Sequence, residues 1–295
     1  MIDCHFHLDE NLVGAEGLVA SLDAHGMRKA AVMAPMCPDL EWRRVLAVGG
    51  PVLRRGLSSR EGVFRGAALF LYRNMVKQGG EVDVGGKRYP ITPQPDNDPV
   101  ARAVAAHPDR LWGWIFVNPA GPVDPVEEIN RLAGKPGMMG VKAHPFWHAF
   151  PTRDLESTAR ACADRGLPLL LHLGAGEQGD VESLASAFPG VAFLLAHAGV
   201  PRPRETCALA GKRNNVFVDL SAASYVDARV ARMAVDLAGA EKCLFGSDGP
   251  YFHHKNGRYD YSERTAMLNS LGLSPADRER VAEKNFLKML EFSGG

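Results

Sequence analysis

Short apolar runs recur along the chain and predict eight β-strands. Most runs are hydrophobic throughout and do not alternate with polar residues, which is typical of parallel strands covered on both faces. The predicted strands are residues 2–8, 30–34, 112–117, 138–143, 168–173, 191–197, 216–220 and 242–246.

The segments between these strands predict helices. Residues 153–165 are amphipathic, and Gly166 behind them can take the left-handed conformation of a helix C-cap. Ser274 and Pro275 are typical of an N-cap and a first helical position, and they predict a final helix that ends near residue 292. From the third strand onward the strands lie roughly 25 residues apart, which is the length of a βα unit.

The alternation of strands and helices predicts an α/β protein, and two architectures fit it. One is a (β/α)8 TIM barrel, and the other is an open, doubly wound sheet. We favour the barrel, as a single domain over residues 1–295. A closed barrel brings strand 8 beside strand 1, and the polar residues described below must meet there.

Residues 35–111 separate the second and third strands, far more than one helical crossover needs. We therefore predict an insertion over residues 38–100, which includes a hairpin-like segment at residues 82–91 and the basic residue Arg73. Because the insertion follows a strand, it should begin at the carboxyl face, where barrel active sites lie, and act as a lid. The alternative is a decoration packed outside the helical ring.

The composition is typical of a soluble globular protein, with 46% hydrophobic and 23% charged residues and a formal net charge of zero. The balanced charge argues against a nucleic-acid or membrane-surface protein. No apolar run approaches the roughly 18 to 20 residues that span a bilayer. Five cysteines without a CxxC pair, and no visible signal peptide, indicate reduced thiols and a cytoplasmic location. The expected partner is a small-molecule substrate, and a homo-oligomer is compatible with the sequence.

Five residues of metal-ligand type stand at the ends of predicted strands. His5 and His7 are two residues apart on the first strand, so both project from one face. His172, His197 and Asp248 each follow a separate apolar run. The carboxyl ends of barrel strands share one face of the molecule, so the pattern predicts a metal site in an enzyme.

Imidazole nitrogen and carboxylate oxygen suit one divalent ion, Zn2+ first, with Mn2+, Fe2+, Co2+ and Ni2+ as rivals. We expect His5, His7 and His172 to be neutral nitrogen ligands. Asp248 can bind the ion and accept the proton of an ion-activated water, while His197 holds the water or polarises the substrate. Each residue alone could be a capping or core residue, so the prediction rests on their combination.

The chain resembles the amidohydrolase superfamily, specifically its amidohydrolase 2 branch of TIM-barrel metal-dependent hydrolases, which includes aminocarboxymuconate-semialdehyde decarboxylase-like enzymes. The matching stretches are residues 2–8 (IDCHFHL), 140–145 (GVKAHP), 170–172 (LLH), 195–199 (LAHAG) and 244–250 (LFGSDGP). The resemblance covers nearly the whole chain except the insertion. It implies that His5, His7, His172 and Asp248 bind metal and that His197 assists catalysis.

Lys142 leaves the number of metal ions open. In binuclear relatives within that superfamily a lysine of strand 4 is carboxylated and bridges two ions, whereas the resembled branch commonly uses one ion. We favour one ion, with Lys142 as an electrostatic or substrate-binding group beside His144 on the same strand face. A second ion requires a carboxylated Lys142, and a solvent-facing lysine is the remaining alternative.

Two loops rich in aromatic rings follow strands 4 and 8, at residues 145–150 and 250–261. Together with the insertion they supply the other substrate-binding candidates, Trp147, Tyr251 and Arg73. Rings form flat apolar walls and cations bind carboxylates, which favours a small aromatic or unsaturated acid as substrate. The alternative is that the rings pack the lid.

Two reactions fit the predicted site. The leading hypothesis is a hydrolase that attacks an amide, lactone or ester bond with a metal-activated water, and the alternative is a decarboxylase, a lyase that uses the same ligands. A non-catalytic binding protein should lack a ligand, and none is missing. Residues 174–179 (GAGEQG) match a dinucleotide-binding motif, but His197 stands where its acidic partner is expected, which argues against an NAD enzyme.

Overall fold

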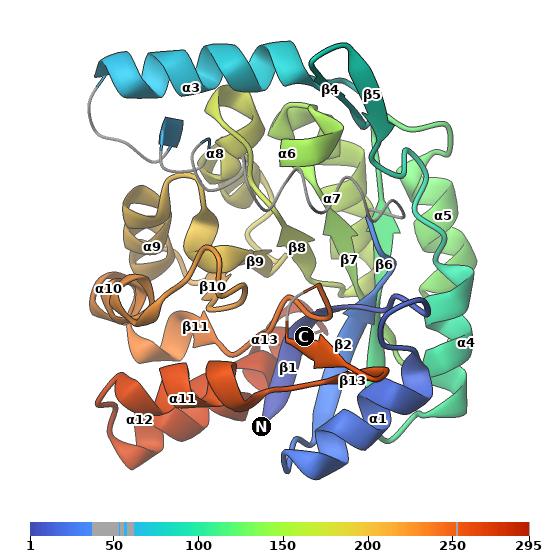
Figure 1. Ribbon diagram of the computed structural model, residues 1–295, viewed down its shortest axis with the longest axis vertical. Helices are drawn as coiled ribbons and strands as arrows, with labels where there is room; N and C mark the ends of the chain where they lie inside the picture. The colour runs from blue at the N-terminus through green and yellow to red at the C-terminus, as the bar shows by residue number, and fades with distance from the viewer. Residues whose placement is uncertain (37–52, 54–55, 58–61, 252, 295) are drawn as a thin grey trace.

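Eight parallel strands form a barrel with helices outside it, as predicted (Figure 1). The computed structural model describes residues 1–36, 53, 56–57, 62–251 and 253–294. The strand order is β1 (Ile2–His7), β2 (Lys29–Met33), β6 (Leu111–Val117), β7 (Met138–Ala143), β8 (Leu169–Leu171), β9 (Phe193–Leu195), β10 (Val216–Asp219) and β11 (Cys243–Leu244). All eight predicted strands are present, and the closed arrangement excludes the open sheet.

The barrel closes where β1 meets the chain that follows β11. Within the described residues these two strands share no regular ladder, and single backbone hydrogen bonds join them. The N–H of Cys4 donates to Phe245 O (3.1 Å), and the N–H of His7 donates to Gly249 O (2.7 Å). We call this junction the seam, and the segment that forms it carries Asp248.

Helices cover the outside of the barrel. They are α1 (Ala15–Ala24), α4 (Asp98–Ala106), α5 (Pro125–Leu132), α6 (Pro145–His148), α7 (Glu156–Arg165), α8 (Val181–Ala187), α9 (Pro203–Lys212), α10 (Ala228–Ala238), α11 (Ser262–Ser270), α12 (Pro275–Glu279) and α13 (Asn285–Gly294). The predicted caps are present, since Gly166 has a φ of 63° and Ser274 Oγ accepts the N–H of Asp277 (3.1 Å). A π-helical turn (Arg280–Lys284) divides the predicted final helix.

Apolar side chains fill the interior of the barrel at the amino ends of the strands. Ile2, Cys4 and Leu170 belong to one buried apolar cluster inside the barrel. Phe286 and Met289 of α13 join that cluster, so this helix closes the amino-terminal end. The carboxyl ends of the strands are therefore left for the polar residues.

The insertion between β2 and β6 stands at the carboxyl end of the barrel. It contains α3 (Gly62–Met75) and an antiparallel sheet of β3 (Val76–Lys77), β4 (Glu81–Val84) and β5 (Lys87–Pro90). The hairpin expected at residues 82–91 is β4 and β5. Residues 38–52, 54–55 and 58–61 of the predicted insertion lie outside the described residues.

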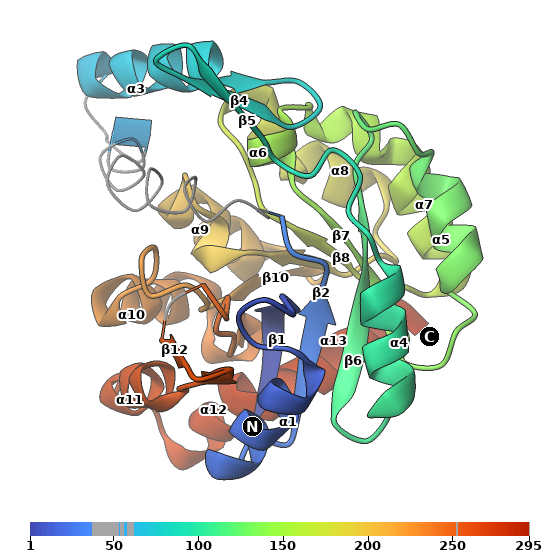
Figure 2. The ribbon, with the colours of Figure 1, turned by 45° about the vertical axis from the view of Figure 1, so that its right-hand side comes forward.

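Contacts join the insertion to the loops after β7 and β8. Figure 2 shows α3 and the β4–β5 hairpin at the same end of the molecule as α6. The Tyr72 hydroxyl lies within hydrogen-bond distance of two acceptors, Phe146 O and Gln178 Oε1, the latter at 2.7 Å. The N–H of Gly79 donates to His148 O (2.9 Å). The described part of the insertion therefore rests on the catalytic face expected of a barrel.

Three further features bear on the sequence predictions. A small hairpin of β12 (His254–Lys255) and β13 (Arg258–Tyr259) follows the seam. The described cysteines are free and buried, and they are Cys4, Cys162, Cys207 and Cys243, while Cys37 lies outside the described residues. None of the helices in the described residues is long and apolar enough to cross a membrane.

Candidate metal centre

A β-bulge in β1 aims both histidines of the first motif into the barrel. The pairing with β2 shifts between Asp3 and Phe6, so Cys4 and His5 together oppose one residue of β2. Cys4 packs in the interior cluster, and the His5 ring beside it lies 5.0 Å from the His197 ring. Because His7 follows two residues after His5, the bulge sends both imidazoles to the inner face.

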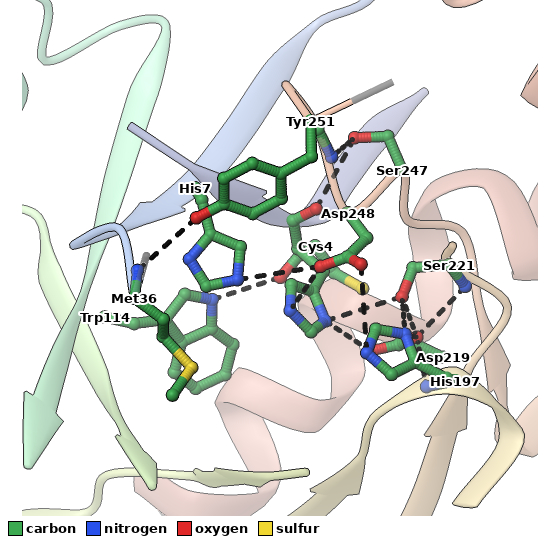
Figure 3. Close-up of polar contacts among 12 residues, drawn as sticks. Cys4, His7, Met36, Trp114, His197, Asp219, Ser221, Ser247, Asp248 and Tyr251 are labelled. Carbon is green, nitrogen blue, oxygen red and sulfur yellow. Dashed lines mark hydrogen bonds and ion pairs between the residues drawn. The ribbon is translucent and has the colours of Figure 1, made fainter. Parts of the chain in front are cut away.

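Three imidazoles surround the carboxylate of Asp248 (Figure 3). His5 Nε2 lies 3.3 Å and His7 Nε2 lies 3.6 Å from Asp248 Oδ1. His197 Nε2 lies 4.0 Å from the other oxygen, Oδ2. One donor atom each from His5, His197 and Asp248 lie within 4.8 Å of one another, which is a spacing that could hold a metal ion.

The far nitrogen of each imidazole on β1 is held by a protein oxygen. His5 Nδ1 lies 2.9 Å from Asp219 Oδ2, and His7 Nδ1 lies 2.9 Å from Ala34 O. Neither oxygen can donate a proton, so each Nδ1 carries the hydrogen and each Nε2 keeps its lone pair. His5 and His7 thus present Nε2 as a ligand atom toward Asp248.

His197 is held by a short relay of hydrogen bonds. Its Nδ1 lies 2.8 Å from Ser221 Oγ, and the Ser221 hydroxyl donates to Asp219 Oδ1. Asp219 therefore orients His5 directly and His197 through Ser221. The Tyr225 ring stacks on His197 at 4.9 Å with an interplanar angle of 6°.

Backbone strain accompanies two of these residues. His197 and Asp248 have φ values of 55° and 60°, in the left-handed region that side chains rarely adopt. The N–H of His197 donates to Asp219 Oδ1 (2.8 Å), and the N–H of Asp248 donates to His5 O (2.8 Å). Asp219, which orients the imidazoles, thus also holds the strained backbone of His197, while the backbone of His5 holds that of Asp248.

Burial keeps the imidazoles neutral. It lowers the pKa of His5, with the charge of Lys142 adding to the effect, although Asp219 opposes it. Burial also lowers the pKa of His197 well below its ordinary range. Burial alone would raise the pKa of Asp219, but the neighbouring imidazoles of His5 and His197 and the hydrogen bonds from His5 and Ser221 prevail and lower it. Neutral imidazoles and ionised carboxylates are the protonation states that metal binding requires.

His172 lies on the other side of His197. Their ring centroids are 4.6 Å apart, and the His172 ring stacks on that of His144 at 4.0 Å. The structure brings His5, His7, His197 and Asp248 together, and His172 borders this group. Its expected role as a ligand stays a prediction.

Lys142 is fully buried, which excludes the solvent-facing alternative. Its Nζ has no hydrogen-bond partner within the described part of the chain. Burial lowers the pKa of Lys142 to about 8, while the charges of Asp219 and Asp248 act in the opposite direction. His144, on the same strand face, accepts the N–H of Trp147 at its Nδ1 (3.1 Å) and so caps α6.

The remaining substrate-binding candidates lie at different depths. Trp147 and Tyr251 are half-buried, and the Tyr251 ring lies 5.3 Å from that of His7. The Tyr251 hydroxyl accepts the N–H of Met36 (3.4 Å), as Figure 3 shows. Arg73 is exposed on α3. Tyr251 thus borders the imidazole group directly, whereas Arg73 belongs to the outer surface of the insertion.

Three site residues were missed by the sequence analysis: Asp219, Ser221 and Tyr225. Asp219 is the last residue of β10, in a position similar to those of His172 after β8 and His197 after β9. The rule that polar residues at strand ends are site candidates could therefore have found it. Ser221 lies two residues further on and shares its direction. No local pattern distinguishes Tyr225.

Sequence comparison places the chain in a family. Residues 2–292 match the profile of the amidohydrolase family. A comparison with curated protein sequences finds no match.

Solved structures with the same fold include enzymes of two reaction types. One, from Acinetobacter baumannii, is described as a probable 2-pyrone-4,6-dicarboxylic acid hydrolase with citric acid bound (TM-score 0.61, 13% identity, 98% of each chain covered). A second is 2,6-dihydroxybenzoate decarboxylase from Rhizobium (TM-score 0.57, 14% identity, 99% of each chain covered). A third is 5-carboxyvanillate decarboxylase from Novosphingobium aromaticivorans in complex with manganese (TM-score 0.52, 16% identity, 92% of this chain and 79% of that chain covered).

Proposed function

The chain belongs to the amidohydrolase family, and on that premise we propose that it is a metal-dependent hydrolase of a small, carboxylate-bearing substrate. The bond that it cleaves is an amide, a lactone or an ester. The observation that carries the proposal is the group of imidazole nitrogens directed at Asp248, which suits a divalent cation.

One buried atom provides the test of fit for a metal ion. His5 Nε2 is buried and has no hydrogen-bond partner within the described residues. Leaving such a group unsatisfied costs about 1–3 kcal/mol, and a cation would satisfy it. We propose His5, His7, His172 and Asp248 as the ligands of one Zn2+ ion, with Mn2+, the metal of one structural neighbour, as the first rival. When bound, the ion supplies Lewis acidity and lowers the pKa of a water molecule.

The other residues of the centre move and hold protons. Asp248 accepts a proton from the attacking water, since its oxygens face both His7 and His197. His197, neutral at rest, takes that proton at Nε2, which lies 4.0 Å from Asp248 Oδ2, and delivers it to the leaving group. Its Nδ1–H is held by Ser221, whose hydroxyl donates to Asp219, so the relay stabilises the charged imidazole.

On the substrate side, we propose that the groups across from the seam recognise a carboxylate. Lys142 supplies a buried positive charge, and His144 stands on the same strand face. Trp147 and Tyr251 provide ring walls at the rim. The insertion acts as the lid, with Tyr72 fastening it to the loops after β7 and β8. Arg73, exposed on α3, is the cationic candidate that the insertion offers for the substrate carboxylate.

A decarboxylase remains the second candidate. Two of the structural neighbours are decarboxylases of aromatic acids, and the proposed ligands serve that reaction equally well. Product analysis in 18O-labelled water separates the two reactions. Hydrolysis incorporates 18O into the organic product, whereas decarboxylation releases CO2 and leaves an organic product without 18O.

The experiment that tests the metal centre compares three variants. Asp248→Ala and His172→Ala should each reduce metal affinity by more than about 100-fold, because removing a ligand exceeds the 10–100-fold effect of removing its outer partner. The control is His107→Ala, which removes a histidine on the barrel exterior that pairs with Glu16. Metal content by elemental analysis and affinity by chelator competition are the readouts. Full metal retention in Asp248→Ala and His172→Ala would overturn the ligand set.

A further inference from the structure

A single buried carboxylate joins the two segments that carry the metal donors. Asp3 Oδ1 accepts the N–H of His5 (3.0 Å) and the N–H of Ser247 (2.9 Å). Its Oδ2 accepts the hydroxyl of Ser247 and the hydroxyl of Tyr261, the latter at 2.9 Å. Asp3 and Tyr261 are fully buried and Ser247 nearly so, which makes these charge-assisted hydrogen bonds costly to break.

The first of these hydrogen bonds holds the bulge in β1. A bulge leaves one residue outside the regular ladder, and its backbone N–H then needs another acceptor. The bulge contains Cys4 and His5, and Asp3 supplies the acceptor for the N–H of His5. Without the bulge, Cys4 and His5 would face opposite sides of the sheet. Asp3 therefore helps to keep the imidazole of His5 inside the barrel.

The other hydrogen bonds hold the turn around Asp248. Ser247 precedes Asp248, and its Oγ also accepts the N–H of Gly249, the residue after Asp248 (3.1 Å). Asp248 itself has a left-handed backbone, so its direction depends on these neighbours. Because the seam has no regular ladder among the described residues, the Asp3 carboxylate is one of the few groups that tie its two edges together.

We propose that Asp3 is the positioning residue of the metal centre, which fixes His5 and Asp248 at the separation that one cation requires. Asp3 points to the outer face of β1 and reaches Tyr261 at the start of α11, so it acts through the backbone and does not touch the ion. The inference rests on the proposed function, since it concerns how the proposed ligands are placed.

The test uses a graded series on the full chain. Asp3→Asn keeps an oxygen for the His5 N–H but loses the second acceptor, Asp3→Ala loses both, and Tyr261→Phe removes one outer hydrogen bond only. The control is Asn215→Ala, because the Asn215 side chain is also buried and donates to three backbone oxygens, those of Ala185, Phe188 and Val191. Asn215 lies at the amino end of β10, away from the donors.

Dissociation constants for Zn2+ and Mn2+ are measured by chelator competition, together with urea unfolding of the metal-free proteins. We expect Asp3→Asn to weaken metal binding by about 10–100-fold. Asp3→Ala should weaken it further and Tyr261→Phe by less, while Asn215→Ala lowers stability and keeps the wild-type affinity. Adding metal should then stabilise the control as much as the wild type, and stabilise Asp3→Asn less.

Two results would overturn the inference. One is wild-type affinity in both Asp3→Asn and Tyr261→Phe. The other is an equal loss of affinity in Asn215→Ala, which would make the effect one of general stability. If Asp3→Ala does not fold, Asp3→Asn and Tyr261→Phe still decide. A wild-type protein that binds no metal contradicts the proposed function itself, and is thus distinguished from a failure of the positioning role.

Discussion

The two sides of the barrel mouth use histidine in opposite ways. On the seam side, His5, His7 and His197 each have Nδ1 fixed by a protein oxygen, and each directs Nε2 at Asp248. Asp219 adds a second carboxylate behind them. Fixed tautomers and two carboxylates make this side attractive to a cation.

On the opposite side, the buried groups are Lys142 and the imidazoles of His144 and His148, and His172 stands between the two sides, next to both His144 and His197. The rings of His144 and His172 stack on each other, and burial together with the charges of His172 and Lys142 lowers the pKa of His144 well below its ordinary range. A buried ammonium repels a cation and attracts an anion. The comparison teaches that the carboxylates, and not the number of histidines, distinguish the two sides of the mouth, and it supports the proposal that the seam side binds the cation and the Lys142 side binds the substrate.

Of the changes that test this comparison, the largest effect is expected from removing the carboxylate that orients the histidines of the seam side. Asp219→Asn should lower metal affinity by about 10–100-fold, because the amide cannot accept from His5 and from the Ser221 relay with the same strength. Chelator competition measures the change. Asp124→Asn, which replaces the exposed N-cap of α5, is the matched control and should leave the affinity unchanged. Equal affinities in both variants would show that the orientation of His5 does not matter.

The strands and most donors of the seam side were predictable from the sequence. Parallel strands covered on both faces must be apolar, so the apolar runs predict the strands. The polar residues at the ends of these runs are the donor candidates His172, His197 and Asp248. Asp219 is harder to find by this rule, because apolar Leu220 follows it and the apolar run therefore extends past it. The insertion was predicted from length alone, since no crossover needs so many residues.

The bulge in β1 could not be predicted in the same way. The sequence of residues 2–7 alternates in a manner that suits a regular strand, with His5 and His7 on one face and Cys4 on the other. The bulge is accompanied by the hydrogen bond from the His5 N–H to Asp3, and Asp3 is held by Ser247 and Tyr261 from the far end of the chain. A feature that depends on contacts so distant in sequence leaves no local pattern.

A smaller effect is expected from His148, which joins the substrate side to the insertion. Burial lowers the pKa of His148 to about 4, from 6.5. Its Nε2 lies 3.3 Å from Thr92 O, and Nδ1 has no hydrogen-bond partner within the described residues. The unfolded chain therefore binds a proton more readily than the folded one, so the contribution to stability is complete above pH 6.5 and is lost as the pH falls toward 4.

The measurement is urea unfolding of the wild type and of His148→Gln between these two pH values. As the pH falls through this window, the free energy of unfolding of the wild type should decrease by on the order of 1–3 kcal/mol more than that of the variant. The difference between the two proteins isolates His148 from the other buried histidines. If the free energy of unfolding changes with pH by the same amount in both proteins, His148 gains its proton without breaking its contact with the insertion. That result would weaken the distinction between the two sides.

The smallest expected effect concerns Lys142, where we predict no change in metal content. Lys142→Met keeps the length and the apolar stem of the side chain and removes the charge. If Lys142 is an ammonium that faces a substrate carboxylate, then elemental analysis should give one ion per chain in the wild type and in the variant, with or without added bicarbonate. Stability should not fall, because a buried ammonium without a hydrogen-bond partner carries a desolvation cost.

A second ion that is present only in the wild type and only with bicarbonate would mean that Lys142 is carboxylated. Both sides of the mouth would then bind cations, and the division between them would fail.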